Sequence, residues 1–576
     1  ADAASVRRLA ARGLVAVVRE RVERDPFERG VAALGGGTAV HQLTGEQAQA
    51  LERLAARVDA GRFHVALLHG VTGSGKTEVY VRLAQHVRAS GRRALVLVPE
   101  IALAPGVAAR FRETFGARVA IQHSGLADGE RHDQWQRIRR GEVDVVVGTR
   151  SAVFAPLDRL GLVVVDEEHD TAYKQEESPR YHARDVAVVR ARRADALVVL
   201  GSATPALETY HNAVQGRYER IVLERRVLDR PLAAVRIVDM REEYREHGPE
   251  VVLSAPLVEA LEDRLRRGEQ AVVLLNRRGF ATAVFCRQCA GTVECPNCSV
   301  SLTVHRGSRR ARCHYCNYST AVPRQCPACA APYLELAGFG TERVEVELRA
   351  RFPAARIARL DRDTIRRRGA LVALLERFAA RELDVLVGTQ MIAKGHDFPA
   401  VTLVGVVSAD IGLGLADFRA AERTFQLLTQ VAGRAGRGDL RGEAFVQTLY
   451  PGHYSIEHAC RQDYAGFFAR ELEFRRAMRY PPAVAMINVI VRGAALGDAM
   501  SLAADLAAAV RRRARDFRVL GPAPAPLVRL RGEHRAQFFL KGTHRAAMRS
   551  ALRAALDELP GAARRTTIDV DPLSVL

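Results

Sequence analysis

Apolar and polar positions alternate along much of the chain on two length scales. In residues 38–225, short apolar runs such as Val65–His69 and Leu162–Val165 are separated by longer segments such as Glu78–Arg88, in which apolar residues recur every three to four positions. Short runs of this kind predict buried strands, and the longer segments predict amphipathic helices. Because strands that alternate with helices build a parallel sheet, we expect an α/β lobe here.

The same alternation returns in residues 226–283 and 333–479, where we expect a second α/β lobe. A helix is predicted over Pro256–Arg267 and a strand over Ala271–Leu275. A cysteine-rich block at residues 284–332 separates the two halves of this pattern. The block is therefore predicted to be an insert in the second lobe.

The two terminal segments have their own patterns. Residues 480–576 show the order β-α-β-β-α-β, with a strand over Met486–Val491 and a helix capped by Asp498, which predicts a small α+β domain. Residues 1–37 are predicted to form a helix, a strand over Leu14–Val22 and a glycine-rich linker.

The charge balance changes the picture of what this α/β protein binds. The chain has 86 Lys and Arg against 66 Asp and Glu, a net charge of +20. Such an excess favours a partner that carries phosphates or an anionic membrane surface. No apolar run approaches the roughly 18 residues needed to span a bilayer, so we expect a cytoplasmic protein with no membrane contact.

Lysine is rare among the basic residues. Of the 86, only four are Lys, namely Lys76, Lys174, Lys394 and Lys541. Where Lys persists in such an Arg-rich chain, the site can require a compact ammonium that a planar guanidinium does not replace. For Lys541 we expect only chance.

Eight of the nine cysteines form four C-x-x-C pairs within 44 residues. Disulfides are disfavoured in a reducing compartment, and a redox role is disfavoured because no thioredoxin-like strand and helix surround the pairs. Eight thiolates suit two tetrahedral structural zinc sites, but the spacing leaves open which pairs share an ion. The predicted ligands are Cys286, Cys289, Cys295, Cys298, Cys313, Cys316, Cys326 and Cys329.

A phosphate-binding loop follows the predicted strand Val65–His69. The sequence GVTGSGKT has the spacing G-x-x-x-x-G-K-[ST] between a strand and a helix. Backbone N–H groups of such a loop surround phosphates, the Lys contacts the β- and γ-phosphates, and the Thr hydroxyl binds Mg²⁺. The predicted nucleotide-binding residues are Gly70, Val71, Thr72, Gly73, Ser74, Gly75, Lys76 and Thr77.

Two carboxylates end the predicted strand Leu162–Val165. Asp166 stands where a residue of the Mg²⁺ shell is expected, and Glu167 can orient and deprotonate an attacking water. This pair favours hydrolysis over transfer to a hydroxyl. A solvated acidic loop is the weaker interpretation, because the carboxylates follow four apolar residues directly.

Two arginines near the end of the second lobe are candidates for contacts with the transferred phosphate. Arg434 and Arg437 are three positions apart and are predicted to share one face of a helical turn. Arginines presented by one lobe to a nucleotide on the other stabilise transition-state charge. A solvated pair is the alternative for any Arg in so basic a chain.

The ordered motifs resemble those of superfamily 2 helicases. They are Gln47, GVTGSGKT, DEEH, GSATP at residues 201–205, GTQMIAKGHDF and QVAGRAGR. With eight cysteines between the motifs of the second lobe, the whole chain is similar to the PriA family of replication restart helicases, also called primosomal protein N′. The resemblance implies two RecA-like P-loop lobes and an ATP-dependent 3′–5′ DNA helicase, with Mg²⁺ and ATP as cofactors, that remodels stalled replication forks and initiates primosome assembly.

The resemblance also assigns residues that the spacing does not. It pairs Cys286/Cys289 with Cys326/Cys329 and Cys295/Cys298 with Cys313/Cys316, as two nested zinc sites, and it places Gln47 at the nucleotide. It makes residues 170–185 an aromatic-rich loop that couples DNA contact to hydrolysis, here called the coupling loop. Its candidate residues are Tyr173, Lys174, Arg180, Tyr181 and Arg184, with His182 as a further phosphate contact.

The partners implied by the resemblance are forked and single-stranded DNA, the single-stranded-DNA-binding protein, primosome proteins and the loader of the replicative helicase. Members of the family carry a DNA 3′-end-binding module and a winged helix ahead of the lobes. In residues 1–37 we expect only the last helix and strand of that winged helix, so the sequence is expected to be a fragment of a bacterial cytoplasmic protein.

Two other functions fit the residues alone. An RNA helicase, or a duplex translocase without strand separation, would use the same ATP site. A zinc-bearing DNA-binding scaffold with a conformational ATP switch is a different class, which Asp166 together with Glu167 disfavours. The basic residues of the last domain suit either a nucleic-acid backbone or an ordinary solvated face, and they are Arg529, Arg531, Arg535 and Lys541.

Overall fold

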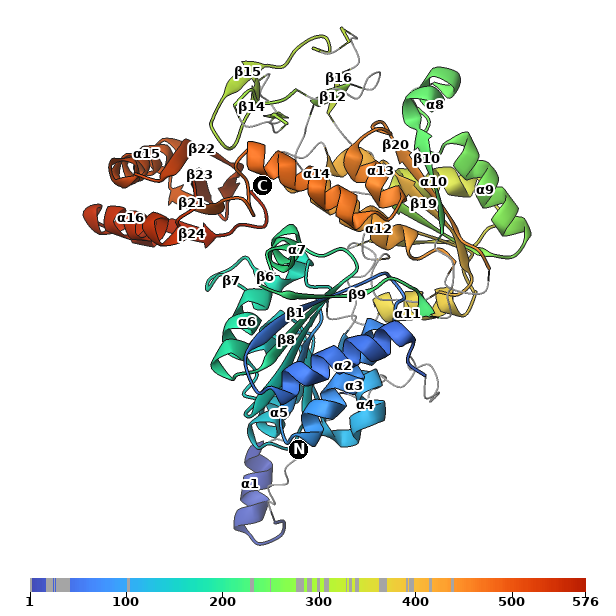
Figure 1. Ribbon diagram of the computed structural model, residues 1–576, viewed down its shortest axis with the longest axis vertical. Coiled ribbons are helices and arrows are strands. Elements are labelled where there is room, and N and C mark those ends of the chain that lie inside the picture. The colour runs from blue at the N-terminus through green and yellow to red at the C-terminus, as the bar shows by residue number, and fades with distance from the viewer. Residues whose placement is uncertain are drawn as a thin grey trace.

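The computed structural model contains two parallel-sheet lobes, a cysteine-rich insert and a C-terminal domain (Figure 1). The α/β fold class expected from the sequence is confirmed. The structure describes residues 3–16, 24, 26, 42–100, 104–227, 233–248, 250–275, 284–286, 293–297, 301–304, 310–327, 329–330, 334–336, 341–361, 370–389, 392, 398–413, 417–436 and 440–575.

Lobe 1 is a seven-stranded sheet in the order β3-β4-β2-β5-β8-β1-β9 with helices on both faces. All of its strand pairs are parallel, and their apolar side chains are buried on both faces, as crossover helices require. The strands are β1 (His64–Gly70), β2 (Arg93–Leu97), β3 (Val119–Gln122), β4 (Val145–Gly148), β5 (Leu160–Asp166), β8 (Leu197–Ser202) and β9 (Glu219–Leu223). The helices are α2 (Gly45–Asp59), α3 (Lys76–Ala89), α4 (Ala104–Phe115), α5 (Asp128–Arg139), α6 (Ala183–Arg193) and α7 (Leu207–Val214).

Lobe 2 is a six-stranded parallel sheet in the order β10-β20-β19-β11-β18-β17. Its strands are β10 (Ala234–Asp239), β11 (Gln270–Leu275), β17 (Ile357–Leu360), β18 (Val385–Gly388), β19 (Val401–Val407) and β20 (Glu443–Thr448). Its helices are α8 (Met240–His247), α9 (Ala255–Arg266), α10 (Thr341–Arg351), α11 (Ala370–Ala379), α12 (Ala420–Ala432), α13 (Tyr454–Cys460) and α14 (Tyr464–Ala477).

The cysteine-rich insert follows β11 and is built from short antiparallel strands. They are β12 (Val284–Cys286) paired with β16 (Leu334–Leu336), and β13 (Thr303–Val304), β14 (Arg310–Arg312) and β15 (Ser319–Ala321) in a second sheet. The insert lies at the top of the molecule in the view of Figure 1, above α14.

The C-terminal domain is a four-stranded antiparallel sheet in the order β22-β23-β21-β24, with helices on one face. Its elements are β21 (Ala485–Gly493), α15 (Leu496–Arg513), β22 (Phe517–Leu530), β23 (Glu533–Gly542), α16 (Arg545–Glu558), α17 (Ala562–Arg565) and β24 (Thr566–Val570). The predicted order of strands and helices is confirmed. Asp498 does not precede α15, as expected, but lies in its first turn, where its carboxylate accepts a hydrogen bond from Ala495 N at 3.1 Å.

At the start of the chain, α1 spans Ala3–Ala11. The strand expected from Leu14 does not begin there, because residues 12–15 form a turn and a bend. The remainder of that predicted strand lies in residues 17–22, outside those that the structure describes. None of the described helices is both long enough and apolar enough to cross a membrane.

Candidate nucleotide site and its surroundings

The phosphate-binding loop joins β1 to α3 as predicted. Lys76, the first residue of α3, is 9% exposed, and its Nζ donates a hydrogen bond to Gly70 O at 2.9 Å. Gly75 has a φ of +77°, and a side-chain carbon at this position would lie 2.2 Å from Gln47 Nε2. Only glycine tolerates both the positive φ and the close approach of Gln47. The loop therefore leads tightly into the N-terminus of α3, where free backbone N–H groups favour an anion.

Gln47 contacts this loop directly. Its Nε2 donates to Ser74 O at 2.8 Å, while its Oε1 accepts from Thr44 N at 2.9 Å in the capping box of α2. One side chain thus begins a helix and supports the phosphate-binding loop. The structure places Gln47 beside the loop, and its contact with a nucleotide stays a prediction.

Asp166 ends β5, and Glu167 follows it. They lie at the same edge of the sheet as the phosphate-binding loop after β1, with β8 between the two strands. Burial and the carboxylate of Glu167 raise the pKa of Asp166 to about 6, and Lys76 acts in the opposite direction. Glu167 has a φ of +45°, which is uncommon for a residue with a side chain and is typical of functional sites. The residues present therefore fit Mg²⁺ and ATP, because a cation would relieve the repulsion between the Asp166 carboxylate and the adjacent, partly exposed Glu167 carboxylate.

Lobe 2 reaches this site through the end of α12. Gly433 O accepts a hydrogen bond from Arg226 Nη2 at 3.2 Å, and a side-chain carbon at Gly433 would lie 2.9 Å from Thr72 Cβ. The second lobe thus packs against the phosphate-binding loop. Arg434 follows Gly433 in a turn after the end of α12, where its N–H donates to Val431 O at 2.9 Å. Because Arg437 lies outside the described residues, the expectation that the two arginines share one face stays a prediction.

A polar chain also connects the two lobes beside Asp166. His169 Nδ1 lies 2.8 Å from Ser202 Oγ, and His169 Nε2 lies 2.9 Å from Nε2 of Gln430, a residue of α12. The imidazole therefore joins β8 of lobe 1 to the helix that leads to Arg434. A movement of α12 relative to β8 would therefore alter these hydrogen bonds.

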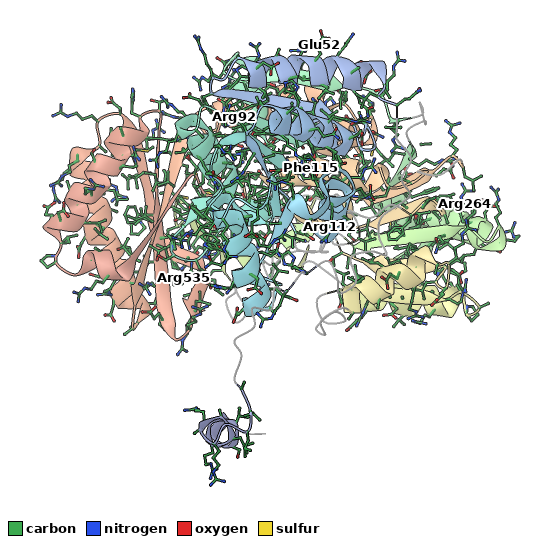
Figure 2. The ribbon with its side chains drawn as sticks, turned by 90° about the horizontal axis from the view of Figure 1, so that it is seen from below. Glu52, Arg92, Arg112, Phe115, Arg264 and Arg535 are labelled. Carbon is green, nitrogen blue, oxygen red and sulfur yellow. The ribbon has the colours of Figure 1, made fainter. Side chains whose placement is uncertain are left out.

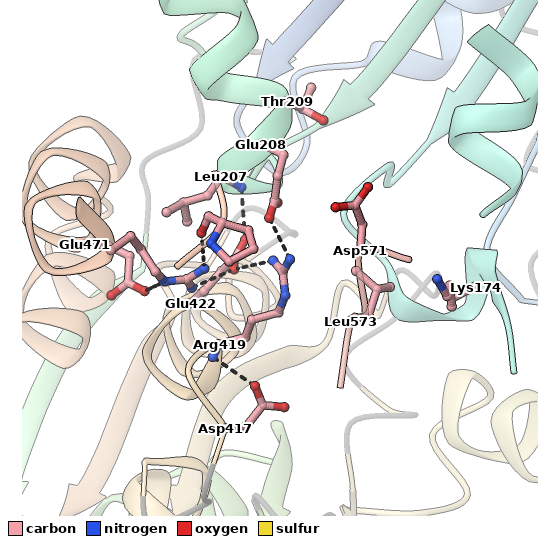
Figure 3. Close-up of polar contacts among 12 residues, drawn as sticks. Lys174, Leu207, Glu208, Thr209, Asp417, Arg419, Glu422, Glu471, Asp571 and Leu573 are labelled. Carbon is pink, nitrogen blue, oxygen red and sulfur yellow. Dashed lines mark hydrogen bonds and ion pairs between the residues drawn. The ribbon is translucent and has the colours of Figure 1, made fainter. Parts of the chain in front are cut away.

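A buried ionic network holds α7 of lobe 1 against α12 and α14 of lobe 2 (Figure 3). Arg419 pairs with Glu208 at 2.6 Å, and Glu422 Oε1 accepts from Leu207 N at 2.9 Å. Arg475, which is fully buried, pairs with Glu422 at 3.1 Å and with Glu471 at 2.6 Å. The Arg419 guanidinium lowers the pKa of Glu208 to about 2, although burial alone would raise it. Sequence patterns did not indicate this network.

The cysteines that the structure describes form two clusters. Cys286 gathers with Cys326 and Cys329, and Cys295 gathers with Cys313 and Cys316, with all sulfurs of a cluster within 4.8 Å of one another. The Sγ atoms of Cys286 and Cys329 are 3.7 Å apart, and those of Cys295 and Cys316 are 3.5 Å apart. A tetrahedral zinc site with Zn–S bonds of 2.3 Å requires about 3.8 Å. The clusters agree with the nested pairing, and the fourth predicted ligands, Cys289 and Cys298, lie outside the described residues.

The second cluster does not stand free of the rest of the protein. The ring of Tyr315 stacks on Phe539 at 5.2 Å between centroids, and Gln537 Nε2 donates to His314 O at 2.9 Å. Apolar side chains of the insert, Val293, Leu302 and Val304 among them, share one buried cluster with residues of the C-terminal domain. The insert therefore has an apolar core that it forms jointly with this domain.

The coupling loop is folded against the C-terminal domain. Lys174 Nζ pairs with Asp569 at 2.7 Å, and both side chains are 5% exposed. Arg180 pairs with the same carboxylate at 3.1 Å. The two short strands of the loop are β6 (Lys174–Gln175) and β7 (Tyr181–His182).

The remaining residues of the loop also contact protein. Tyr173 is fully buried and donates its hydroxyl to Asp166 O at 2.6 Å, so it is not placed to stack on a base. Arg184 pairs with the fully buried Glu168 at 2.9 Å, and Tyr181 contacts the ring of Phe154 edge to face. Burial, reinforced by Arg184 and Lys174, lowers the pKa of His182 to about 3. His182 is therefore neutral at pH 7, and its contact with a phosphate stays a prediction.

Comparisons with known proteins agree with this arrangement. Four family models match: DEAD/DEAH box helicase at residues 44–213, PriA DNA helicase Cys-rich region domain at 295–320, helicase conserved C-terminal domain at 341–439, and primosomal protein N C-terminal domain at 476–573. Replication restart protein PriA of Bacillus subtilis is 45% identical over 96% of this chain and 69% of its own length.

A second curated relative and one solved structure also match this chain. Replication restart protein PriA of Synechocystis is 41% identical over 100% of this chain and 69% of its own. Among solved structures, RecG bound to a three-way DNA junction matches with a TM-score of 0.46 and 18% identity, covering 77% of this chain and 48% of that one. On the sequence identities and on the two PriA-specific family models, the chain belongs to the PriA family of replication restart helicases.

Proposed function

We propose that this chain is an ATP-hydrolysing DNA helicase with 3′–5′ polarity that remodels stalled replication forks and initiates primosome assembly. The observation that carries the ATPase part is the packing of Gly433 of lobe 2 on Thr72 of the phosphate-binding loop, beside Asp166 and Glu167. Two lobes that meet at a nucleotide can convert hydrolysis into relative motion. DNA as substrate, the polarity and the role in restart are supported by family membership.

Each residue at the site has a role in this proposal. Lys76 would bind the β- and γ-phosphates, and Thr77 and Asp166 would hold the shell of Mg²⁺. Mg²⁺, when bound, supplies neutralisation of phosphate charge. Glu167 orients and deprotonates water, and Arg434, together with Arg437, stabilises the charge that develops on the transferred group.

A basic surface of the C-terminal domain supports contact with a nucleic-acid backbone. Arg492 and Arg535 are directly opposite each other on β21 and β23, and Arg492 pairs with Glu533 at 3.1 Å. Figure 2 shows Arg535 on the side of this domain that faces lobe 1. Arg180 of the coupling loop and Arg535 line the same cavity of about 60 Å³. Burial and the charges of Arg180 and Arg492 lower the pKa of Arg535.

The other basic residues of that domain divide into two groups. Arg529 and Arg531 are exposed at the end of β22 and in the turn after it, where they can extend the surface. Lys541 is instead 8% exposed, with Nζ 3.7 Å from the centroid of the Tyr480 ring, so it is a packing residue rather than a phosphate contact. We propose that forked and single-stranded DNA bind this surface, with the single-stranded-DNA-binding protein, primosome proteins and the helicase loader as further partners.

One experiment tests the motor. Purified protein is assayed for ATP hydrolysis and for unwinding of forks whose tails expose either a 3′ or a 5′ end, beside the variant Lys76→Arg. We expect DNA-stimulated hydrolysis and one-directional unwinding in the parental protein and loss of both in the variant, because a planar guanidinium does not replace the ammonium at the phosphates. Hydrolysis in Lys76→Arg near the parental rate would contradict the assignment of the site.

A further inference from the structure

Tyr80 contacts the carboxylate that is proposed to hold Mg²⁺. It lies one helical turn after Lys76 in α3, and its hydroxyl donates a hydrogen bond to Asp166 Oδ1 at 3.0 Å. The side chain is 1% exposed. A side-chain carbon at Gly201 would lie only 1.7 Å from this hydroxyl, so the glycine at the end of β8 leaves room for it. The phenol is thus held on three sides by α3, β5 and β8.

Tyr173 contacts the same aspartate from the opposite face of the lobe 1 sheet. Its hydroxyl lies 2.6 Å from Asp166 O and 3.0 Å from Leu97 O, and its ring is fully buried. The next residue, Lys174, is held by the C-terminal domain through Asp569. The Tyr173 side chain therefore connects the backbone at Asp166 to Lys174 of the coupling loop, which forms an ion pair with the C-terminal domain.

We propose that Tyr80 and Tyr173 are positioning residues for Asp166, Tyr80 through the carboxylate and Tyr173 through the backbone carbonyl, and that Tyr173 carries the position of the coupling loop to the ATP site. The inference rests on the proposed ATPase function. Partners that orient a metal ligand typically change metal affinity or activity by 10–100-fold when they are removed. A single hydroxyl on Asp166 is expected to act at the low end of that range.

The first test removes the Tyr80 hydroxyl with Tyr80→Phe. Binding of a fluorescent ADP analogue is measured over a series of Mg²⁺ concentrations and in EDTA. We expect the Mg²⁺ concentration needed for half-maximal effect to rise by about tenfold, with binding in EDTA unchanged, because the phosphate-binding loop is intact. An unchanged Mg²⁺ requirement would overturn the role of Tyr80.

A second variant displaces the same hydroxyl without removing it. Gly201→Ala places a methyl group where the Tyr80 hydroxyl lies. It is expected to raise the Mg²⁺ requirement as Tyr80→Phe does, and a parental requirement in Gly201→Ala would likewise overturn the role. If the parental protein shows no Mg²⁺-dependent binding at all, the proposed function fails and this inference fails with it.

Tyr173→Phe tests the connection to the coupling loop. We expect the stimulation by DNA, measured as the ratio of hydrolysis rates with and without DNA, to fall severalfold, since the loop no longer holds the Asp166 carbonyl. Full DNA stimulation in this variant would overturn the connection. Tyr454→Phe is the matched control for the Mg²⁺ requirement, because Tyr454 donates a hydrogen bond to Glu471 of lobe 2 rather than to Asp166, and the Mg²⁺ requirement should not change in it.

Discussion

Asp569 is the residue whose replacement tests the contact between the C-terminal domain and the coupling loop. Its carboxylate binds Lys174 at 2.7 Å and Arg180 at 3.1 Å, and it lies 395 positions after the lysine. In Asp569→Asn the shape is kept and the charge is lost. Lys174, which is 5% exposed, would then be a buried ammonium whose acceptors, the Val570 carbonyl and the amide oxygen of the new side chain, are both uncharged.

The expected cost follows from this burial. Removing one partner of a buried ion pair typically costs about 3–5 kcal/mol, because the other charge stays desolvated and uncompensated. Since 1.4 kcal/mol is a factor of ten in an equilibrium constant, the docked state of the loop should lose at least about 100-fold relative to an undocked one. Lys174 regains water only if the loop leaves the C-terminal domain.

Hydrogen exchange measured by mass spectrometry reports this undocking. Peptides that contain residues 174–182 and 566–570 should lose protection in Asp569→Asn, while those of β1 and β5 keep theirs. In Glu177→Gln, which breaks the pair between Arg531 and Glu177, protection should stay at the parental level, because these side chains are 81% and 75% exposed. Parental protection of the loop in Asp569→Asn would refute the reasoning that the buried pair holds it.

Three other perturbations have expected outcomes. Cys313→Ser with Cys316→Ser should release one zinc per chain, measured as metal content, and should loosen the C-terminal domain against which Tyr315 packs. Because the pKa of His182 is lowered to about 3, the unfolded state binds an extra proton below pH 6.5 and stability is lost as the pH falls. Between pH 7 and 5 the free energy of unfolding, measured by urea titration, should fall by about 2 kcal/mol more in the parental protein than in His182→Asn. The charges of Arg184, Lys174, Asp185 and Glu208 near this ring are kept in that variant. Glu422→Gln should lower the free energy of unfolding by about 3–5 kcal/mol, since Arg419 and Arg475 lose a buried carboxylate, and a change below 1 kcal/mol would contradict the importance of the network in Figure 3.

The sequence predicted the parts of this structure that depend on neighbours along the chain. The phosphate-binding loop, the strand that ends at Asp166 and the order of strands in the last domain all follow from short patterns, because a strand or a helix terminus is specified within about ten residues. Gln47 was found only by resemblance, since its contact with Ser74 joins positions 27 apart. Tyr80, four positions after Lys76 on the same helix, could have been found by asking which side chains of α3 face β5.

The contacts that sequence patterns missed join distant segments. Nothing in the local sequence of Asp569 indicates that its partner is Lys174, and nothing near Tyr315 indicates that its ring stacks on Phe539. The resemblance placed Tyr173 in the loop that contacts DNA, but the structure buries its ring among core side chains of lobe 1. Side-chain direction in a loop is set by tertiary packing, which no periodicity reports.

Burial explains why lysine persists at three positions of this arginine-rich chain. Lys76, Lys174 and Lys541 are 9%, 5% and 8% exposed, and Lys394 lies outside the described residues. Each ammonium is held at short range, by the Gly70 carbonyl, by Asp569 and by the face of the Tyr480 ring respectively. A guanidinium has five donors in a planar fork and would leave several of them without partners in such confined positions. Lys541, for which chance was expected, therefore follows the same physical requirement as the lysine of the phosphate-binding loop.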